Sequence, residues 1–303
     1  MEVLTPQATG NLGSKILAAL NNAGFTVTAI QRKDSPNHAK GAAKSIKVDL
    51  SNESQLTAAF KDQDVVVSAL PNPRLSSDKI WMSAAISAGV KRIVPSEFST
   101  NLEKPLSRKL PIVTEKVAIR KYVEELASSG NIEWTSIDNG PFFSPFIWTG
   151  GWMGPGISSK VTSLHDGGDK IVCTTSLERI GEAVAKALLP EHAEETKNKP
   201  IYVYSAAISE RKMTSIVSKL TGIVFKENVQ SIDDITKDAF AAHEKGDMSK
   251  NMVFYIPFCF GDGYGGDFRY MASNQMLGLK EMTDEEVEGS IKGWLKKRDT
   301  RKA

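Results

Sequence analysis

The sequence has few cysteines and no long apolar run. Cys173 and Cys259 are the only cysteines, they lie far apart, and neither is grouped with histidines. We therefore expect neither a disulfide framework nor a zinc site, and two reduced thiols are typical of a cytosolic protein. No apolar run approaches the roughly 20 residues of a membrane span, and the N-terminus lacks the pattern of a signal peptide. These absences predict a cytoplasmic protein that does not associate with membranes.

An excess of either charge is also missing. Lys and Arg total 38 and Asp and Glu total 36, which leaves a net charge of +2. No basic block of the kind that follows phosphate backbones occurs, so nucleic acid is not expected as a partner. The 303 residues, of which 41% are hydrophobic, suit one large or two modest domains with a sizeable core.

The markers of two common catalytic sites are absent. There is no G-x-S-x-G segment, and no tyrosine is followed four residues later by lysine. The first absence argues against a Ser/His/Asp hydrolase. The second removes the proton donor that many single-domain nicotinamide reductases use. Any reductase activity therefore needs another acid.

Part of a dinucleotide-binding fingerprint is present at the N-terminus. Ala8-Thr9-Gly10-Asn11-Leu12-Gly13 precedes the amphipathic segment Ser14–Ala23. A strand that turns into a helix here leaves backbone N–H groups to bind a pyrophosphate. The G-x-x-G-x-x-G spacing wants glycine at position 7, where Gln7 follows Pro6. We expect a short first strand and, if the turn needs positive φ, strain on the order of 1–2 kcal/mol at Gln7 that weakens cofactor binding, unless this N-terminus is an altered version of a longer one.

Two cations follow the second expected strand, Phe25–Ile30. The sequence there is Gln31-Arg32-Lys33, where a protein that binds NAD wants an acidic residue for the ribose 2′-hydroxyl. Arg32 can form forked hydrogen bonds with a 2′-phosphate, and Lys33 can act as a point charge. The position favours NADP(H) over NAD(H), with a solvated basic loop as the alternative.

Strand and helix patterns then alternate along the chain. The expected strands are Ile46–Val48, Asp64–Leu70, Lys91–Val94 and Ile132–Ile137. Two helices, Ser77–Ala88 and Pro111–Ser128, lie among them. This alternation predicts an α/β fold with a doubly wound parallel sheet of the Rossmann type. Ligands bind at the carboxyl ends of such strands, so Leu70 and Pro95-Ser96-Glu97-Phe98 should face one crevice with the first turn.

A change in composition after the sixth strand indicates a second region. From about residue 144 to 168 the chain is rich in glycine and tryptophan and has little periodicity, which predicts loops that line a pocket. A helix at Leu177–Leu188 and a strand at Pro200–Tyr204 then return to the first domain. We expect a dinucleotide-binding domain of residues 1–143 plus about 175–206. The smaller, mixed substrate-binding region comprises about 144–174 plus 207–303, with two mainly helical segments in 207–248.

The remaining polar candidates are weaker. The four histidines lie in polar surroundings, and only His165, beside Asp166 in the glycine-rich region, is kept as a possible base. Asp262 and Asp267 lie among glycines but lack the alternating ligands and the closing Glu of a calcium loop. No metal site is therefore expected.

Five segments occur in an order that resembles a known family. They are Ala8-Thr9-Gly10-Asn11-Leu12-Gly13, Arg32, Lys91-Arg92-Ile93-Val94-Pro95-Ser96-Glu97-Phe98, Glu115-Lys116-Val117-Ala118-Ile119-Arg120-Lys121 and Asn139-Gly140-Pro141-Phe142-Phe143. The set resembles the isoflavone reductase-like branch of the NmrA-like, atypical short-chain dehydrogenases, particularly its fungal members. The resemblance covers the chain to about residue 145 and continues more weakly to Leu277-Gly278-Leu279.

The resemblance implies an activity and a catalytic residue. Members of this kind bind NADPH and reduce aromatic, often phenylpropanoid-like or isoflavonoid-like, substrates with a lysine four residues before the arginine of an Ile-Arg pair. By that match Lys116 is the acid/base, while Arg120 and Lys121 are surface or ion-pair residues. The pKa of a lysine is normally ~10.4, and the amine must be desolvated for this pKa to fall to the ~7–8 that suits proton transfer. The alternative for Lys116 is a solvated helix lysine.

These arguments define a candidate site. The expected cofactor-binding residues are Thr9, Gly10, Asn11, Leu12, Gly13, Arg32, Lys33, Leu70, Pro95, Ser96, Glu97, Phe98, Lys116 and Asn139. The expected substrate pocket has large aromatic side chains that can equally be plain core: Phe142, Phe143, Trp148, Trp152 and Phe258. The first hypothesis is an NADPH-dependent reductase of a small aromatic substrate, as monomer or homodimer. The alternative is a non-catalytic NADP(H) sensor that acts through a protein partner.

Overall fold

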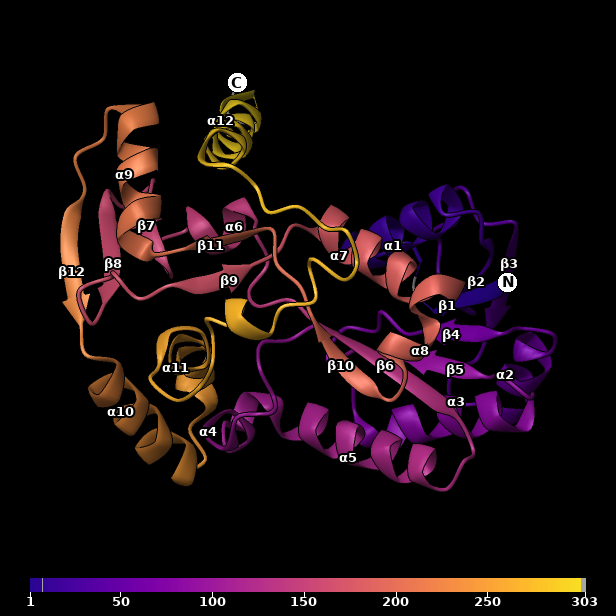
Figure 1. Cartoon of the computed structure of the whole chain (residues 1–303). Coiled ribbons are helices and arrows are strands. Elements are labelled where there is room, and N and C mark those ends of the chain that lie inside the picture. Colours follow the sequence, from indigo (N-terminus) through magenta and orange to yellow (C-terminus); the bar gives the residue numbers. More distant parts are fainter. Residues whose placement is uncertain (7, 301–303) are drawn as a thin grey trace. The chain divides into compact units, whose positions relative to one another are not determined.

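A computed structural model gives the fold of the chain and describes residues 1–6 and 8–300 (Figure 1). It contains two compact units. The first comprises Met1–Phe98, Val113–Asp138 and Leu177–Val203, and the second comprises Ser99–Ile112, Asn139–Ser176 and the chain from Tyr204 onward. The expected division therefore differs at residues 99–112 and 139–143, which belong to the second unit. Asn139 directly follows the strand of the first unit's sheet that ends at Asp138, whereas residues 95–98 separate Ser99 from the strand that ends at Val94.

The first unit is built on a seven-stranded parallel sheet. Its strands are β1 (Glu2–Pro6), β2 (Thr26–Arg32), β3 (Lys44–Val48), β4 (Val65–Val67), β5 (Arg92–Val94), β6 (Glu133–Asp138) and β10 (Lys199–Tyr202). The order across the sheet is β10-β6-β5-β4-β1-β2-β3, and every pair is parallel. The strand order reverses between β1 and β4, which is the arrangement of a doubly wound fold. The predicted fold class is confirmed.

Helices cover both faces of this sheet. They are α1 (Asn11–Asn22), α2 (Glu53–Phe60), α3 (Leu75–Ser87), α5 (Thr114–Ser128), α7 (Leu177–Ala187) and α8 (Ala193–Thr196), with short 3₁₀ turns η1 (Pro111–Val113) and η2 (Pro190–His192). Figure 1 shows α1 and α7 on one face and α2, α3 and α5 on the other. A buried cluster that includes Phe60, Met82, Ile93 and Val123 joins the second group to the sheet. Apolar residues on both faces of the strands explain this two-sided cover.

A glycine allows two of these helices to approach closely. A Cβ atom built on Gly181 of α7 would lie 2.6 Å from the main-chain oxygen of Lys15 in α1. No larger residue fits this contact without movement of one helix. The pair is closed at its edge by an ion pair of 2.9 Å between Lys15 and Glu178. Gly181 therefore sets the distance of α7 from the helix that follows the fingerprint.

The first strand is not unusually short, which corrects the sequence-based expectation. β1 has five residues, whereas β4 and β5 have three each. Pro6 aligns with Ile30 of β2, but the pairing of β1 with β4 extends only over Val3 and Leu4. Because Pro6 is not paired with β4, its missing N–H removes no hydrogen bond between β1 and β4. The expected strain at Gln7 concerns a position outside the described residues.

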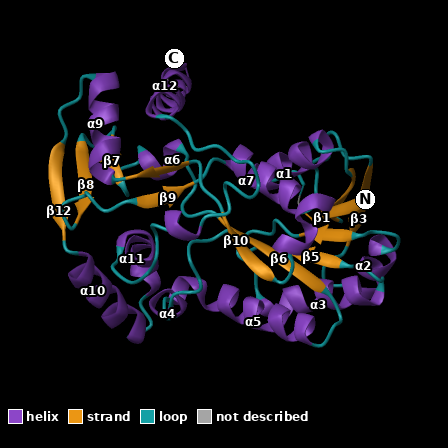
Figure 2. Cartoon of the chain, in the orientation of Figure 1, coloured by secondary structure: helices purple, strands orange, loops and turns teal. Residues whose placement is uncertain are grey.

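The second unit mixes short strands with helices (Figure 2). Its sheets are β12-β8-β7 and β11-β9. The strands are β7 (Gly154–Gly156), β8 (Val161–His165), β9 (Val172–Thr174), β11 (Ala206–Ile208) and β12 (Lys226–Gln230). The helices are α4 (Pro105–Arg108), α6 (Pro145–Trp148), α9 (Glu210–Thr221), α10 (Ile232–Glu244), α11 (Tyr255–Phe260) and α12 (Asp284–Thr300), with 3₁₀ segments η3 (Met248–Phe254) and η4 (Arg269–Met271).

Two expectations about this unit need correction. The segment 144–168, predicted as loops, contains α6, β7 and β8. The segment 207–248 has the two expected helices, α9 and α10, but also β12 between them. β12 gave no strand signal because Lys226, Glu227, Asn228 and Val229 are all exposed on an edge strand, where an inward apolar face is not required.

Among residues 1–6 and 8–300, no helix has the length and apolarity needed to cross a bilayer.

Candidate active site

The helix after the fingerprint begins three residues earlier than expected. Gly10 is the N-cap of α1 with φ −73° and ψ 169°, an extended backbone that any residue can adopt. Asn11, Leu12 and Gly13 form the first turn, whose backbone N–H groups point out of the helix end. This geometry suits an anion at the end of β1, and the assignment of residues 9–13 to cofactor binding stays a prediction.

A groove lies at the carboxyl ends of β2, β3 and β4. Its volume is about 790 Å³, and residues from all three strand ends line it. Arg32 and Lys33 come from the end of β2, and Leu70 follows β4. The structure thus brings these three predicted residues to one place. The Arg32 side chain is 61% exposed and its Nε lies 4.0 Å from Asp34, so its guanidinium is available to a ligand.

Other residues of the groove were missed by the sequence reasoning. They are mainly the residues after β3 and the start of α3, including Asp49, Ser51, Arg74 and Asp78. Their positions gave a usable signal, because Asp49 directly follows a parallel strand and so must lie at the same edge of the sheet. Arg74 adds a third cation to Arg32 and Lys33.

The end of β5 is tied to the end of β4. Ser96 Oγ donates a hydrogen bond of 2.7 Å to the main-chain oxygen of Leu70. The chain then turns tightly, since the Glu97 N–H donates to the Pro95 oxygen at 2.8 Å. Phe98 has φ 29°, in the left-handed region that non-glycine residues rarely adopt. The four predicted residues 95–98 therefore form a constrained turn at the carboxyl edge of the sheet.

Lys116 contacts this turn. It lies in the first turn of α5, is half-buried, and its Nζ donates to the main-chain oxygen of Glu97 at 2.5 Å. Burial lowers the pKa of the Lys116 amine, and the negative charges of Glu97 and Asp138 oppose that shift. The solvated-lysine alternative does not describe this side chain. A buried amine with a lowered pKa next to a strand-end turn has the properties of a proton donor.

Arg120 lies one turn further along α5 and is 2% exposed. Its guanidinium forms two hydrogen bonds with the Glu97 carboxylate: Nε donates to Oε2 at 2.9 Å, and Nη2 donates to Oε1. Nη2 also donates to Ser136 Oγ at 2.8 Å and lies 3.4 Å from Asp138 Oδ2. The ion-pair interpretation of Arg120 is therefore confirmed and the surface interpretation is wrong, whereas Lys121 is exposed.

Asp138 is fully buried at the end of β6 and was not predicted as a site residue. Its Oδ1 has no hydrogen-bond partner among the described residues. Burial raises the pKa of this carboxyl well above its usual range, and the neighbouring Glu97 raises it further. The place of Asp138 directly before Asn139 at a strand end was the signal that could have identified it.

Asn139, the last predicted cofactor residue, belongs to the second unit. It is fully buried, its N–H donates to Ser99 at 2.7 Å, and its Nδ2 donates to Gly140 at 2.6 Å. Its Oδ1 has no partner among the described residues. A role in cofactor binding stays a prediction.

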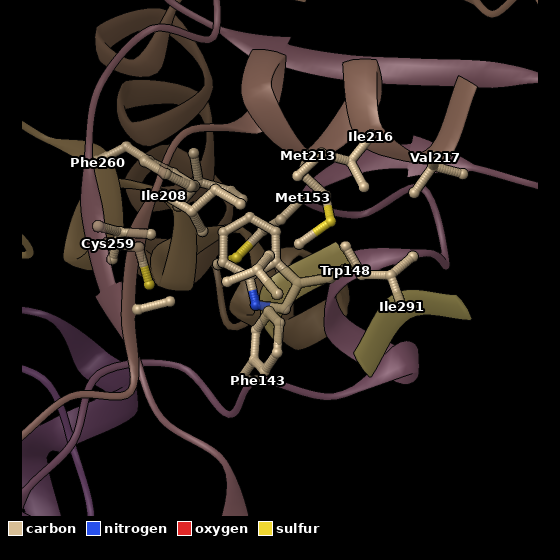
Figure 3. Close-up of a cluster of buried hydrophobic side chains, with 14 of the residues drawn as sticks. Phe143, Trp148, Met153, Ile208, Met213, Ile216, Val217, Cys259, Phe260 and Ile291 are labelled. Carbon is tan, nitrogen blue, oxygen red and sulfur yellow. The ribbon is translucent and has the colours of Figure 1, made fainter. Parts of the chain in front are cut away.

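The predicted aromatic pocket is largely core of the second unit. Trp148 is fully buried, and its indole N–H donates to Thr174 Oγ1 at 3.1 Å. Figure 3 shows the indole between Phe143 and the methionine side chains of the cluster. Phe143 and Phe258 are also buried, so the plain-core alternative holds for these three residues. Phe142 and Trp152 are half-buried, and their role in substrate binding stays a prediction.

His165 is a buried partner of Glu210. Its Nδ1 lies 2.7 Å from Glu210 Oε1, its N–H donates to Glu210 Oε2, and its ring stacks on Phe260. Both side chains are at most 3% exposed. The pair links β8 to the start of α9, so a structural role accounts for His165.

The strand order, the helix that starts at the end of β1 and the cations at the end of β2 define a dinucleotide-binding α/β protein of the Rossmann type. The sequence profile of the NmrA-like family matches residues 2–256. The chain therefore belongs to the NmrA-like family, as its motifs indicated.

Its relatives are oxidoreductases and reductases. The chain is 30% identical to the oxidoreductase aprR of Aspergillus flavus over 96% of this chain and 98% of the relative. It is 28% identical to the isoflavone reductase homolog IRL of Zea mays, over 74% and 76% of the two chains. The similarity to a fungal oxidoreductase and to a plant isoflavone reductase homolog agrees with the predicted branch of the family.

Solved structures share the fold. The leucoanthocyanidin reductase of Vitis vinifera in its binary complex with NADPH has a TM-score of 0.78 and 18% identity, covering 97% of this chain and 99% of that one. A structure described as AtPrR2 with NADP⁺ and (+)pinoresinol has a TM-score of 0.76 and 20% identity, with 97% and 98% covered.

Proposed function

We propose that this chain is an NADPH-dependent reductase that acts on a small aromatic substrate with Lys116 as proton donor. The observation that carries the proposal is the Lys116 amine, buried against the turn that follows β5. The fungal relative that covers nearly the whole chain is an oxidoreductase, and two structural neighbours are complexes with NADPH or NADP⁺. These similarities support the activity and the cofactor.

The groove at the ends of β2, β3 and β4 fits the 2′-phosphate end of NADPH. Arg32, Lys33 and Arg74 are exposed cations on its wall, and an NAD-type acid is absent at the end of β2. Arginine binds a phosphate through paired N–H groups, and lysine adds a point charge. The first turn of α1 would hold the pyrophosphate. When bound, NADPH supplies a hydride.

The chain itself must supply a proton. Reduction of an activated double bond adds a hydride to one of its atoms and a proton to the other. The Lys116 ammonium can donate this proton, because burial lowers its pKa. The contact with the Glu97 carbonyl orients Nζ at the carboxyl edge of the sheet. The aromatic class of the substrate is proposed from the relatives, one of which is an isoflavone reductase homolog.

Calorimetry with NADPH and NADH, followed by a screen of aromatic enones and phenylpropanoid esters for NADPH oxidation, tests the proposal. We expect NADPH to bind more tightly than NADH and at least one compound to be reduced. Tight NADPH binding with no turnover on any compound would favour the NADP(H) sensor. Equal binding of the two cofactors would contradict the assignment of Arg32 and Lys33.

A further inference from the structure

Three buried charged side chains surround Lys116. Within the first unit, the end of β5, the end of β6 and one face of α5 bring Glu97, Asp138 and Arg120 together around it. Glu97 and Arg120 are at most 3% exposed. Buried charges are costly unless they are paired, so this arrangement calls for an explanation.

Glu97 makes two different contacts with the same helix. Its main-chain oxygen accepts from Lys116 Nζ, and its side chain is gripped by the guanidinium of Arg120. Lys116 and Arg120 are four residues apart, so they lie on one face of α5. The helix therefore holds one residue at both its backbone and its carboxylate.

The guanidinium is itself fixed from three directions. It contacts Glu97, it donates to Ser136 Oγ at 2.8 Å, and it lies over the ring of Trp134 at 4.8 Å from the centroid. Ser136 and Trp134 belong to β6. A clamp fixed in this way leaves the Glu97 carboxylate little freedom to turn away.

From this geometry we propose that Glu97, clamped by Arg120, is a positioning residue of the reaction, which orients Lys116 Nζ and stabilises its charged form. The inference rests on the proposed role of Lys116. The negative charge of the Glu97 carboxylate, held in place by Arg120, favours the protonated form of the amine, as does that of Asp138.

Two other acids on these elements have partners away from Lys116. On α5, Glu115 accepts from the Leu75 N–H at 2.8 Å, towards α3. At the opposite ends of β5 and β6, Arg92 is paired with Glu133. Glu97, in the turn after β5, is the acid whose charge can be removed while its main-chain contact with Lys116 Nζ is kept.

Glu97→Gln tests the proposal, because it removes the charge but keeps the size and the main-chain carbonyl. The pKa of Lys116 is measured by competitive acetylation over a pH series, with the peptide that contains Lys116 read by mass spectrometry. We expect this pKa to fall by about one unit. Glu124→Gln, which removes an exposed acid about two turns further along α5, is the control and should leave the pKa of Lys116 unchanged. Unfolding midpoints establish that each variant is folded.

The kinetic consequence has a defined direction. A lysine that donates a proton must be charged, so the rate falls as pH rises through its pKa. In Glu97→Gln that fall should begin about one pH unit lower than in the parent. A purely structural role would lower activity at every pH without moving the profile.

Two outcomes separate this inference from the function itself. An unchanged Lys116 pKa in folded Glu97→Gln overturns the positioning role, even if Lys116 is essential. A shifted pKa together with full turnover of Lys116→Met upholds the relation between the two residues but refutes the catalytic role. If Glu97→Gln does not fold, Arg120→Lys keeps both charges but loses the two-point grip. It should lower kcat about tenfold, and an unchanged kcat overturns the clamp.

Discussion

Lys116 donates from its Nζ to the main-chain oxygen of Glu97 at 2.5 Å, and this contact joins helix α5 to the carboxyl end of β5. A helix lysine that points outward would need no such acceptor. The contact places a partly desolvated amine at the edge of the sheet where doubly wound proteins bind their ligands. The functional account depends on that placement.

Arg32→Ala should weaken NADPH binding about tenfold to a hundredfold and leave NADH binding nearly unchanged. The reason is the loss of a charge-assisted hydrogen bond to the 2′-phosphate, worth about 1.5–3 kcal/mol. Calorimetric titration with both cofactors measures the effect. Lys40→Ala, which removes an exposed cation from the loop before β3, is the matched control. An unaltered ratio of the two affinities in Arg32→Ala would show that the 2′-phosphate lies elsewhere.

Gly181→Ala should lower the free energy of unfolding by about 1–3 kcal/mol, because the new Cβ would collide with the Lys15 carbonyl. Gly293→Ala in α12 is the control, since nothing lies within 4 Å of its Cβ position and alanine favours a helix. Chemical denaturation of both variants makes the comparison. If the two substitutions had equal effects, α1 and α7 would not be held as closely as the structure shows.

Ionisation of the buried Asp78 carboxyl should lower the free energy of unfolding as pH rises. The side chain is fully buried, one oxygen accepts from Trp81 Nε1 at 2.9 Å, and Oδ2 has no partner among the described residues. Burial raises its pKa to about 6. The folded state therefore binds the proton more tightly than the unfolded state, so this group's contribution is present below about pH 4 and is lost as pH rises to about 6.

Asp78→Asn should remove that loss and raise the free energy of unfolding at pH 7 by about 1–2 kcal/mol. Denaturant titrations at about pH 4.5 and about pH 7 measure the difference in the free energy of unfolding between parent and variant. Asp34→Asn, which changes an exposed acid, should have the same free energy of unfolding as the parent at both pH values. A variant that is less stable than the parent at pH 7 would mean that the Asp78 carboxylate is well solvated or paired.

The parallel sheet could be predicted because its strands are short apolar runs separated by helices of regular period. The same logic placed Leu70 and Ser96 at one edge, where they share a hydrogen bond. The partners of Arg120 could not be predicted, since Ser136 and Asp138 come from β6 and Glu97 comes from the turn after β5, and their side-chain directions depend on strand register and turn geometry. Buried aromatic residues such as Trp148 were ambiguous, because the same side chain suits a core and a pocket.

The activity of Lys116→Met is the most direct test of the claim that Lys116 donates the proton. It is compared with Lys121→Met, an exposed neighbour on α5, on a substrate that the parent reduces. We predict that kcat falls at least about a hundredfold in Lys116→Met and that Lys121→Met retains the parent's rate. Full turnover by Lys116→Met would contradict the account, because the proton would then come from another group.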